Sequence, residues 1–494
     1  MAFQLVNPSV IKQGAAMPGD EHKLFDFADH AAESERNVDL IRQFAAAEPF
    51  RSAMVEELEL DDDFYRRPLR PEDLSFIKFN EPVSSATVTQ LPFLATQRML
   101  LCLNELEIAR LPRDGEDELT RFAHFYGGES RILGARIRPF LESFAFDFLT
   151  DFASSQRNTT DLVFDLEQLL KQEVGFWSDS FHLLVRRNYL EEGLRFILLQ
   201  KWCLAPTRRA ALGRAAASGF FDVLDAADRP VIAQQSEEEA LFRRIAVWCQ
   251  VPKQEHSYWQ FYLSTSLSEV NLLYALAARP DKALALMGAA FAAEASWVAL
   301  RGLIEQSGPC FGMGSREQLS RRQEHVKEDL LARAKRAFAA IERRYGARGL
   351  AQVAQGLAAA RTLAASARNN LGEQLDWLSS VERYRSMALA ISARIEAEVP
   401  DIDRETFVEP REMCSTTHVH DDHRLVVIES GNMVFWGNLG MTLRLAPGEM
   451  VLVPQGRLHG SSIESDNCVY HQPIIPDAWI RSVVNEFSDM RAAE

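Results

Sequence analysis

The sequence predicts a multidomain protein in which all-α helical segments are followed by a C-terminal all-β domain. A chain of 494 residues is long enough for two to four domains, each with its own core. Up to about residue 400, apolar residues recur at the three-to-four spacing of amphipathic helices. After Pro400 they follow a period of two, with Gly, Asn and Pro between the runs, which is typical of strands and turns.

Composition and charge exclude several classes of protein. With 47% hydrophobic and 25% charged residues, the chain resembles ordinary globular proteins rather than disordered ones. The formal net charge of −16 disfavours nucleic acid and anionic membranes as partners, since both attract basic surfaces. The longest apolar run, Ala283–Ala293, stops at Glu294 and is far short of the ~20 residues that a membrane helix needs.

Cysteine usage and the first residues bear on location. The chain has six cysteines without CxxC spacing, a pattern that favours reduced thiols over a disulfide framework or a zinc site. The N-terminal residues lack a basic region followed by an apolar run, so no secretory signal is expected. We therefore predict a soluble cytoplasmic protein.

The helical part divides into three predicted units. Residues 1–150 contain amphipathic segments such as SERNVDLIRQF and LPFLATQRMLLCLNE without a catalytic constellation, and packing or dimerisation is their expected role. Residues 151–350 contain six or seven helical segments joined by short turns, which predicts a compact bundle. Residues 351–400 are rich in Ala, Leu and Arg and predict one or two helices that bridge the bundle to the β domain.

The bundle contains one group of residues that could bind a metal. Glu294 lies in the apolar segment AFAAEASWVAL, and a buried carboxylate is costly unless it is paired or bound to a metal. His325 and Asp329 are four residues apart and so project from one helical face, where they could meet Glu294. The alternative is that Glu294 faces solvent or pairs with an arginine, and that His325 and Asp329 belong to an exposed charged face.

Residues 401–494 contain the pattern with the clearest chemistry. His418 and His420 are two positions apart, so on one strand they point to the same face. His459 follows a Pro-Gln-Gly turn, from which its side chain could reach the same point. Three imidazoles on a divalent metal leave open positions for oxygen chemistry or Lewis-acid catalysis. The alternative of three unrelated surface histidines is disfavoured by the spacing.

These spacings resemble the two cupin motifs, which implies an all-β cupin barrel for residues 401–494. The first motif is matched by His418, His420 and Gly431, and the second by Gly448, Pro454, Gly456 and His459. The chain departs from the motifs at Glu412, where a glycine is usual, at Arg424 in place of the glutamate ligand, and at Ile463 in place of an asparagine.

The departures shape the expected site. Arg424 stays protonated and cannot bind a metal, so three histidines are the expected ligands and His423 is expected to face away. Fe(II) is the preferred metal because soft ligands are absent. If Arg424 faces inward, it could pair with a carboxylate or oxyanion of the substrate, which makes it the candidate catalytic side chain.

The order of the predicted units resembles a family of N-nitrosating metalloenzymes known from streptozotocin biosynthesis. The resemblance implies a dimerising helical segment, a haem-oxygenase-like diiron oxidase domain that N-hydroxylates a methylated arginine, and an iron cupin that rearranges the product to an N-nitrosourea. It covers nearly the whole chain. It therefore implies a homodimer, and Fe(II) and O₂ as cofactor and co-substrate.

The diiron ligands of that family are only partly retained. Glu294 matches a glutamate on a late helix, and His325 and Asp329 match the start of a motif on the last helix. The final histidine of that motif falls on Ala332, and the first glutamate falls on Gln200. Because no histidine occurs between His182 and His256, a further ligand is missing. The resemblance therefore implies a degenerate oxidase domain.

The leading hypothesis is an Fe(II)- and O₂-dependent cupin enzyme of natural-product biosynthesis. Its substrate would be an N-hydroxylated guanidine derived from arginine, supplied by a separate N-hydroxylase, and the reaction would form or rearrange an N–N bond. One alternative is another cupin dioxygenase or isomerase with the bundle as scaffold. The other is a non-catalytic cupin that senses a ligand, which would not need three convergent histidines.

Overall fold

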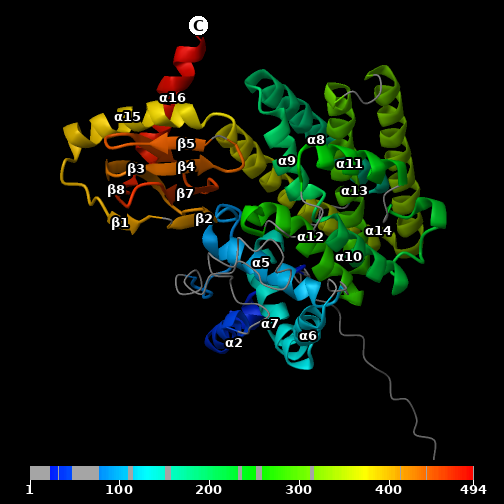
Figure 1. The fold of residues 1–494 in the computed structure, drawn as a ribbon. Helices are drawn as coiled ribbons and strands as arrows, with labels where there is room; N and C mark the ends of the chain where they lie inside the picture. The colour runs from blue at the N-terminus through cyan, green and yellow to red at the C-terminus, as the bar shows by residue number, and fades with distance from the viewer. Residues whose placement is uncertain are drawn as a thin grey trace, which may run out of the picture.

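The computed structural model describes residues 23–31, 33–46, 77–108, 115–150, 157–231, 236–251, 259–311, 316–411, 413–440 and 442–492. A large helical part is followed by a smaller β part, and the two lie side by side in Figure 1. The predicted order of all-α segments and an all-β domain is therefore confirmed.

The N-terminal helices pack around phenylalanine rings. Their bounds are α1 Ala28–Ala31, α2 Ser34–Ala46, α5 Leu91–Glu105, α6 Glu116–Phe125 and α7 Gly128–Phe146. Phe27 contacts Phe140, with ring centroids 5.6 Å apart, and Phe79 contacts Phe144 at 5.0 Å. Part of the predicted segment 1–150 lies outside the described residues, and its role in dimerisation stays a prediction.

The bundle begins with a strong helix start, and its seven described helices surround one core. Asn158 accepts hydrogen bonds from the backbone of Thr160 and Asp161, while Asp161 accepts one from Asn158, so the first turn is capped in both directions. The described helices are α8 Thr159–Arg187, α9 Leu190–Lys201, α10 Ala205–Ala217, α11 Ser236–Trp248, α12 Ser264–Ala277, α13 Ala283–Ser307 and α14 Arg316–Leu378.

Helices α13 and α14 cross at very short range because two glycines face each other there. A Cβ on Gly288 would clash with the backbone of Val353, and one on Gly356 would clash with Ala285. α14 continues across a break at Gly346, where φ is +64°, and its second part packs into the bundle core. The predicted boundary at residue 350 therefore falls inside a helix whose second part belongs to the bundle.

α13 also corrects an expectation about apolar length. The apolar run stops at Glu294, but the helix continues past it, and the helical span Pro280–Cys310 is long and apolar enough to cross a membrane by length and composition. However, 72% of its most apolar window is buried inside the protein. The span is therefore placed as the central helix of the bundle.

The β part consists of two antiparallel sheets that share one core. One sheet has the order β1-β8-β3-β6, with β9 beside β3, and the other has the order β2-β7-β4-β5. Leu425 and Val451 of the first sheet and Phe435 and Leu443 of the second belong to one buried cluster. The strands are β1 Thr406–Pro410, β2 Cys414–His418, β3 His423–Ser430, β4 Met433–Gly437, β5 Thr442–Leu445, β6 Met450–Val453, β7 His459–Ile463, β8 Asn467–His471 and β9 Ile474–Ile475.

Two helices cover the β part. α15 (Val381–Glu398) follows α14 directly and packs along β6 and β3, and α16 (Asp477–Ala492) packs against α15. Figure 1 shows α15 in yellow along the outer face of the sheets and α16 in red at the C-terminus. The described part of the chain therefore ends in a helix rather than a strand.

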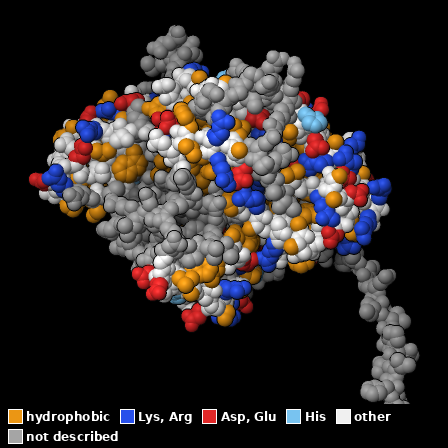
Figure 2. All heavy atoms as spheres, turned by 45° about the vertical axis from the view of Figure 1, so that its right-hand side comes forward, with side chains coloured by type: hydrophobic (Ala, Val, Ile, Leu, Met, Phe, Trp, Pro, Cys, Tyr) orange, Lys and Arg blue, Asp and Glu red, His pale blue; other side chains and the backbone are white. Residues whose placement is uncertain are grey.

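The charge on the visible surface is mixed. Figure 2 shows basic side chains interspersed among acidic ones over the helical part of the face that it presents. Among the coloured side chains of this view, the acidic residues are therefore not gathered into one patch.

Candidate metal centre

His418, His420 and His459 come together at one end of the β part. One ligand nitrogen from each lies within 4.8 Å of the others, and no other group of this kind is found among the described residues. The Nε2 atoms of His418 and His420 are 3.2 Å apart. Two nitrogens that each lie about 2.1 Å from one ion are separated by roughly 3.0 to 3.4 Å, so this spacing fits a shared metal.

Strand pairing brings the histidines together. His418, the last residue of β2, is paired with His459, the first residue of β7. His459 also stacks on Phe435 of the neighbouring strand β4, with ring centroids 5.8 Å apart. Because β2 and β7 are adjacent antiparallel strands, the end of one and the start of the other present their side chains at the same edge.

Burial and hydrogen bonding prepare His459 to bind a cation. Its side chain is 4% exposed. Burial lowers the pKa of His459 well below 6.5, and the imidazoles of His418 and His420 lower it further. Its Nδ1 lies 2.9 Å from the carbonyl oxygen of Arg457, to which it donates. His459 is therefore neutral at pH 7, with its Nε2 lone pair available to a metal.

The loop that carries His459 is held by the bundle. Gln374 of α14 is fully buried, donates from Nε2 to the carbonyl of Gly456 at 2.6 Å and accepts from the amide of Leu458 at 3.2 Å. Trp377, one turn further, donates to the carbonyl of Leu458 at 2.8 Å. One helix of the bundle thus sets the backbone immediately before His459.

A second contact joins the loop after His420 to the N-terminal helices. Asp421, just after His420, accepts a hydrogen bond from the amide of Leu91 at the start of α5, at 2.9 Å. Val419 and Leu458 belong to the buried core of the helical part rather than to that of the sheets. The candidate metal centre therefore lies at the junction of the helical and β parts.

Replacing Gln374 by alanine is expected to weaken metal binding about 10- to 100-fold, the usual effect of removing groups that orient metal ligands. The reason is that the Gly456–Leu458 backbone loses both of its bonds to α14. The measurement is metal affinity by isothermal titration of the metal-free protein with Fe(II) under anaerobic conditions.

Gln355→Ala supplies the matched control for this experiment. Gln355 lies about five turns earlier on α14, roughly 28 Å away along the helix. The control is expected to keep the affinity of the unaltered protein. Equal affinities for all three proteins would show that α14 does not set the position of His459.

Arg424 and His423 lie on β3 in different surroundings. Arg424 Nη1 donates to Glu405 at 3.1 Å and to Gln472 at 3.3 Å, while its buried Nε has no hydrogen-bond partner among the described residues. The charge of Arg424 also helps to lower the pKa of His459. His423 accepts a hydrogen bond from the amide of Gln455 and is not part of the histidine group.

The structure does not assemble the metal site expected in the bundle. Arg333 forms a buried ion pair with Glu294 and a second ion pair, at 2.8 Å, with Asp329. His325 is exposed to solvent. The grouping of Glu294, His325 and Asp329 is therefore corrected, because a guanidinium lies where a metal would have to bridge the two carboxylates.

Gln200 has a structural role of its own. Its Nε2 donates to the carbonyl of Phe261 at 2.7 Å, and its Oε1 accepts from the amide of Leu263 at 3.0 Å. The side chain is thus bound to the turn that precedes α12. An amide supplies both the donor and the acceptor, whereas a carboxylate in this position could only accept.

Sequence reasoning missed Gln374 and Trp377. A polar glutamine within the otherwise apolar face of LGEQLDWL was the available signal, because a buried amide must find partners. Nothing in the sequence indicates that those partners lie 82 and 84 residues away.

Comparison with known proteins supports the expected resemblance. No protein-family model matches the chain. The chain is 28% identical over 428 residues to a nitrosourea synthase from Streptomyces achromogenes subsp. streptozoticus, which covers 83% of this chain and 89% of that protein. Its helical part and β part follow in the order that the resemblance implied. Over most of its length, this chain is thus similar to a nitrosourea synthase.

Proposed function

We propose that this protein is an oxidative enzyme of natural-product biosynthesis that uses Fe(II) and O₂ at His418, His420 and His459. Its substrate is an N-hydroxylated guanidine derived from arginine, and its reaction forms or rearranges an N–N bond, as in N-nitrosation. The observation that carries the proposal is the convergence of three imidazoles in a chain similar to a nitrosourea synthase.

The donor set supports a metal with open positions. Three imidazoles would hold one face of an ion, and no carboxylate or thiolate joins the group among the described residues. When bound there, Fe(II) supplies the capacity to bind and reduce oxygen. The protein contributes the orientation of the three rings, through strand pairing of His418 with His459 and through the hold of α14 on the loop.

Arg424 is the candidate for substrate recognition. Its guanidinium is paired with Glu405, whose side chain is half exposed, and its Nε remains free to donate. An arginine-derived substrate carries a carboxylate, which can exchange with Glu405 and form a bidentate pair with Arg424. This places the guanidine end of the substrate, rather than its carboxylate, toward the histidines.

The ion pair of Glu294 with Arg333 supports a substrate that arrives already hydroxylated. Arg333 pairs with both Glu294 and Asp329, so neither of these two carboxylates is left for iron in the described part of the bundle. A separate N-hydroxylase then supplies the substrate. The bundle keeps a structural role, since α14 holds the loop that precedes His459.

The test compares N-hydroxylated N-methylarginine with N-methylarginine itself. Protein loaded with Fe(II) is exposed to O₂, and products are identified by mass spectrometry after incorporation of ¹⁵N at the guanidine. We expect consumption of the hydroxylated compound with a new N–N bond, no consumption of the parent, and loss of activity in His418→Ala. Conversion of the parent would assign hydroxylation to this chain, and oxygen uptake without any N–N product would contradict the proposed reaction.

A further inference from the structure

A cavity lies between the N-terminal helices and the bundle, and the residues that line it are far from the three histidines along the chain. It has a volume of about 1060 Å³ and is bounded by α5, α6 and α7 on one side and by α10 and α12 on the other. Sites for small ligands commonly enclose roughly 300 to 1,000 Å³, so this cavity has room for a whole small molecule.

One part of the cavity is apolar. Leu103 and Leu106 of the α5 region are buried, and Phe122 of α6 lies across from them, next to Tyr126 with ring centroids 4.8 Å apart. Ile132 of α7 lines the rim and is 64% exposed. This wall can bury the apolar body of a ligand, and it leaves a large hydrophobic side chain in water when nothing is bound.

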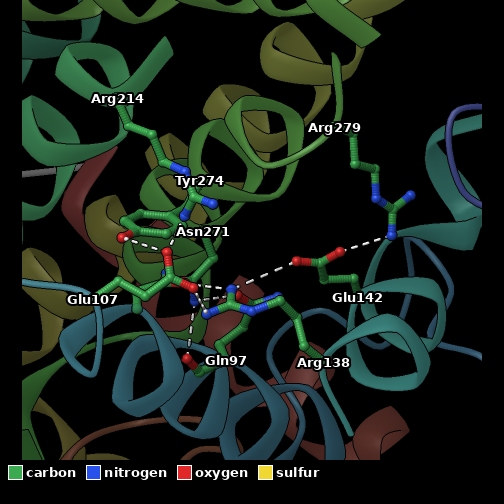
Figure 3. Close-up of polar contacts among 9 residues, drawn as sticks. Gln97, Glu107, Arg138, Glu142, Arg214, Asn271, Tyr274 and Arg279 are labelled. Atoms are coloured by element: carbon green, nitrogen blue, oxygen red, sulfur yellow. Dashed lines mark hydrogen bonds and ion pairs between the residues drawn. The ribbon is translucent and has the colours of Figure 1, made fainter. Parts of the chain in front are cut away.

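The other part of the cavity is a charged cluster, drawn in Figure 3. Glu107 accepts from Arg138 at 3.4 Å through Oε1 and from the hydroxyl of Tyr274 at 3.3 Å through Oε2. Arg214 of α10 reaches the same Oε2. Arg138 is anchored further by the side chain of Asn104, at 2.7 Å. Both arginines are thus oriented toward one point by bonds already made.

Charge at the cavity wall is positive although the protein is acidic. Three arginines line it, namely Arg131, Arg138 and Arg214, and Glu107 is the one carboxylate among the lining residues. Glu107 is already paired with Arg138 and Arg214, and Arg138 also pairs with Glu142 behind the wall. A cationic ligand would therefore meet surplus positive charge, whereas an anionic ligand would be neutralised by it.

We propose that this cavity binds a small carboxylate with an apolar or aromatic body. The body lies against Leu103, Leu106 and Phe122, and the carboxylate pairs with Arg214, whose side chain is 42% exposed. Arginine is suited to this role because its planar guanidinium presents paired donors to a carboxylate. Since the lining comes from α5–α7 and from α10 and α12, the ligand joins the N-terminal helices to the bundle.

The experiment uses three probes that share one apolar body: 4-phenylbutyrate, 4-phenylbutan-1-ol and 4-phenylbutylamine. Each is titrated calorimetrically into the full-length protein. We expect the acid to bind at least tenfold more tightly than the alcohol, and the amine not to bind, because a charge-assisted pair with arginine favours the acid. Arg214→Gln is expected to remove the preference of acid over alcohol.

Two further variants complete the design. Arg136→Gln is the matched control, since Arg136 is an exposed arginine on α7 that does not line the cavity, and it is expected to leave all three affinities unchanged. Ala135→Trp fills the cavity from an exposed rim position without changing any charge, and it is expected to abolish binding of the acid.

Three outcomes would overturn the proposal. The first is equal binding of acid and alcohol by the unaltered protein, and the second is binding of the acid that survives both Arg214→Gln and Ala135→Trp. The third is failure of the acid to bind the unaltered protein, together with a dimer, seen by sedimentation velocity, that dissociates in Ala135→Trp. That result would show that a second copy of the chain covers the cavity.

Discussion

Protein with alanine in place of His459 is expected to bind essentially no Fe(II), whereas the unaltered protein binds about one per chain. The three ligand nitrogens lie within 4.8 Å of one another, and the ring of His459 is the buried member of the set. Its loss leaves two partly exposed imidazoles, which cannot retain a divalent ion against water. Metal per chain is measured by inductively coupled plasma mass spectrometry after anaerobic loading and gel filtration.

His423→Ala is the matched control for this prediction. His423 lies close to the ligands in sequence, but its imidazole accepts from the amide of Gln455 and does not join the histidine group. The control is expected to bind the same amount of iron as the unaltered protein. Retention of iron by His459→Ala would contradict the assignment of the site, and two or three irons in the unaltered protein would show that the bundle also binds metal.

Replacing Arg333 by methionine is expected to destabilise the bundle by about 3 to 5 kcal/mol, as the loss of one partner from a buried ion pair usually does. Glu294 and Arg333 are 7% and 8% exposed in their side chains, so the remaining carboxylate would be buried without a counter-charge. Urea unfolding followed by far-ultraviolet circular dichroism measures the change as a shift of the helical transition.

Two variants separate the buried pair from ordinary surface pairing. Arg336→Met removes an arginine one turn further along α14, whose side chain is 53% exposed and pairs with Asp228. Its expected effect is at most about 1 kcal/mol, because exposed ion pairs contribute little. Glu294→Gln combined with Arg333→Met is expected to regain part of the stability, since it removes the buried charge. A shift for Arg333→Met no larger than that for Arg336→Met would contradict the account of the pair.

Local patterns were sufficient to predict much of the candidate site. The two-residue spacing of His418 and His420 and the turn before His459 predicted that the three side chains meet, which they do. The strand reason holds only for His418 and His459, because β2 ends at His418 and His420 follows it. The change from helical to strand periodicity after Pro400 predicted the order of the two parts. Glu294 was singled out as a costly carboxylate, with a metal as the first explanation and exposure to solvent or pairing with an arginine as the alternative.

Long-range packing decided the rest. The sequence could not choose between metal and arginine for Glu294, because Arg333 lies 39 residues away and reaches it only when α14 packs against α13. It also gave no sign that Gln374 holds the loop before His459, or that α14 continues past Gly346.

By itself, then, the sequence predicted the helical and β parts, the three candidate ligands, and an arginine, Arg424, in place of the usual glutamate ligand. These depend on the period of each segment and on the chemistry of single residues. The tertiary structure decided which charges meet, in particular that Arg333 neutralises Glu294 and that α14 positions His459. Those contacts depend on how helices cross and dock, and their energies arise only when side chains distant in the chain are buried together.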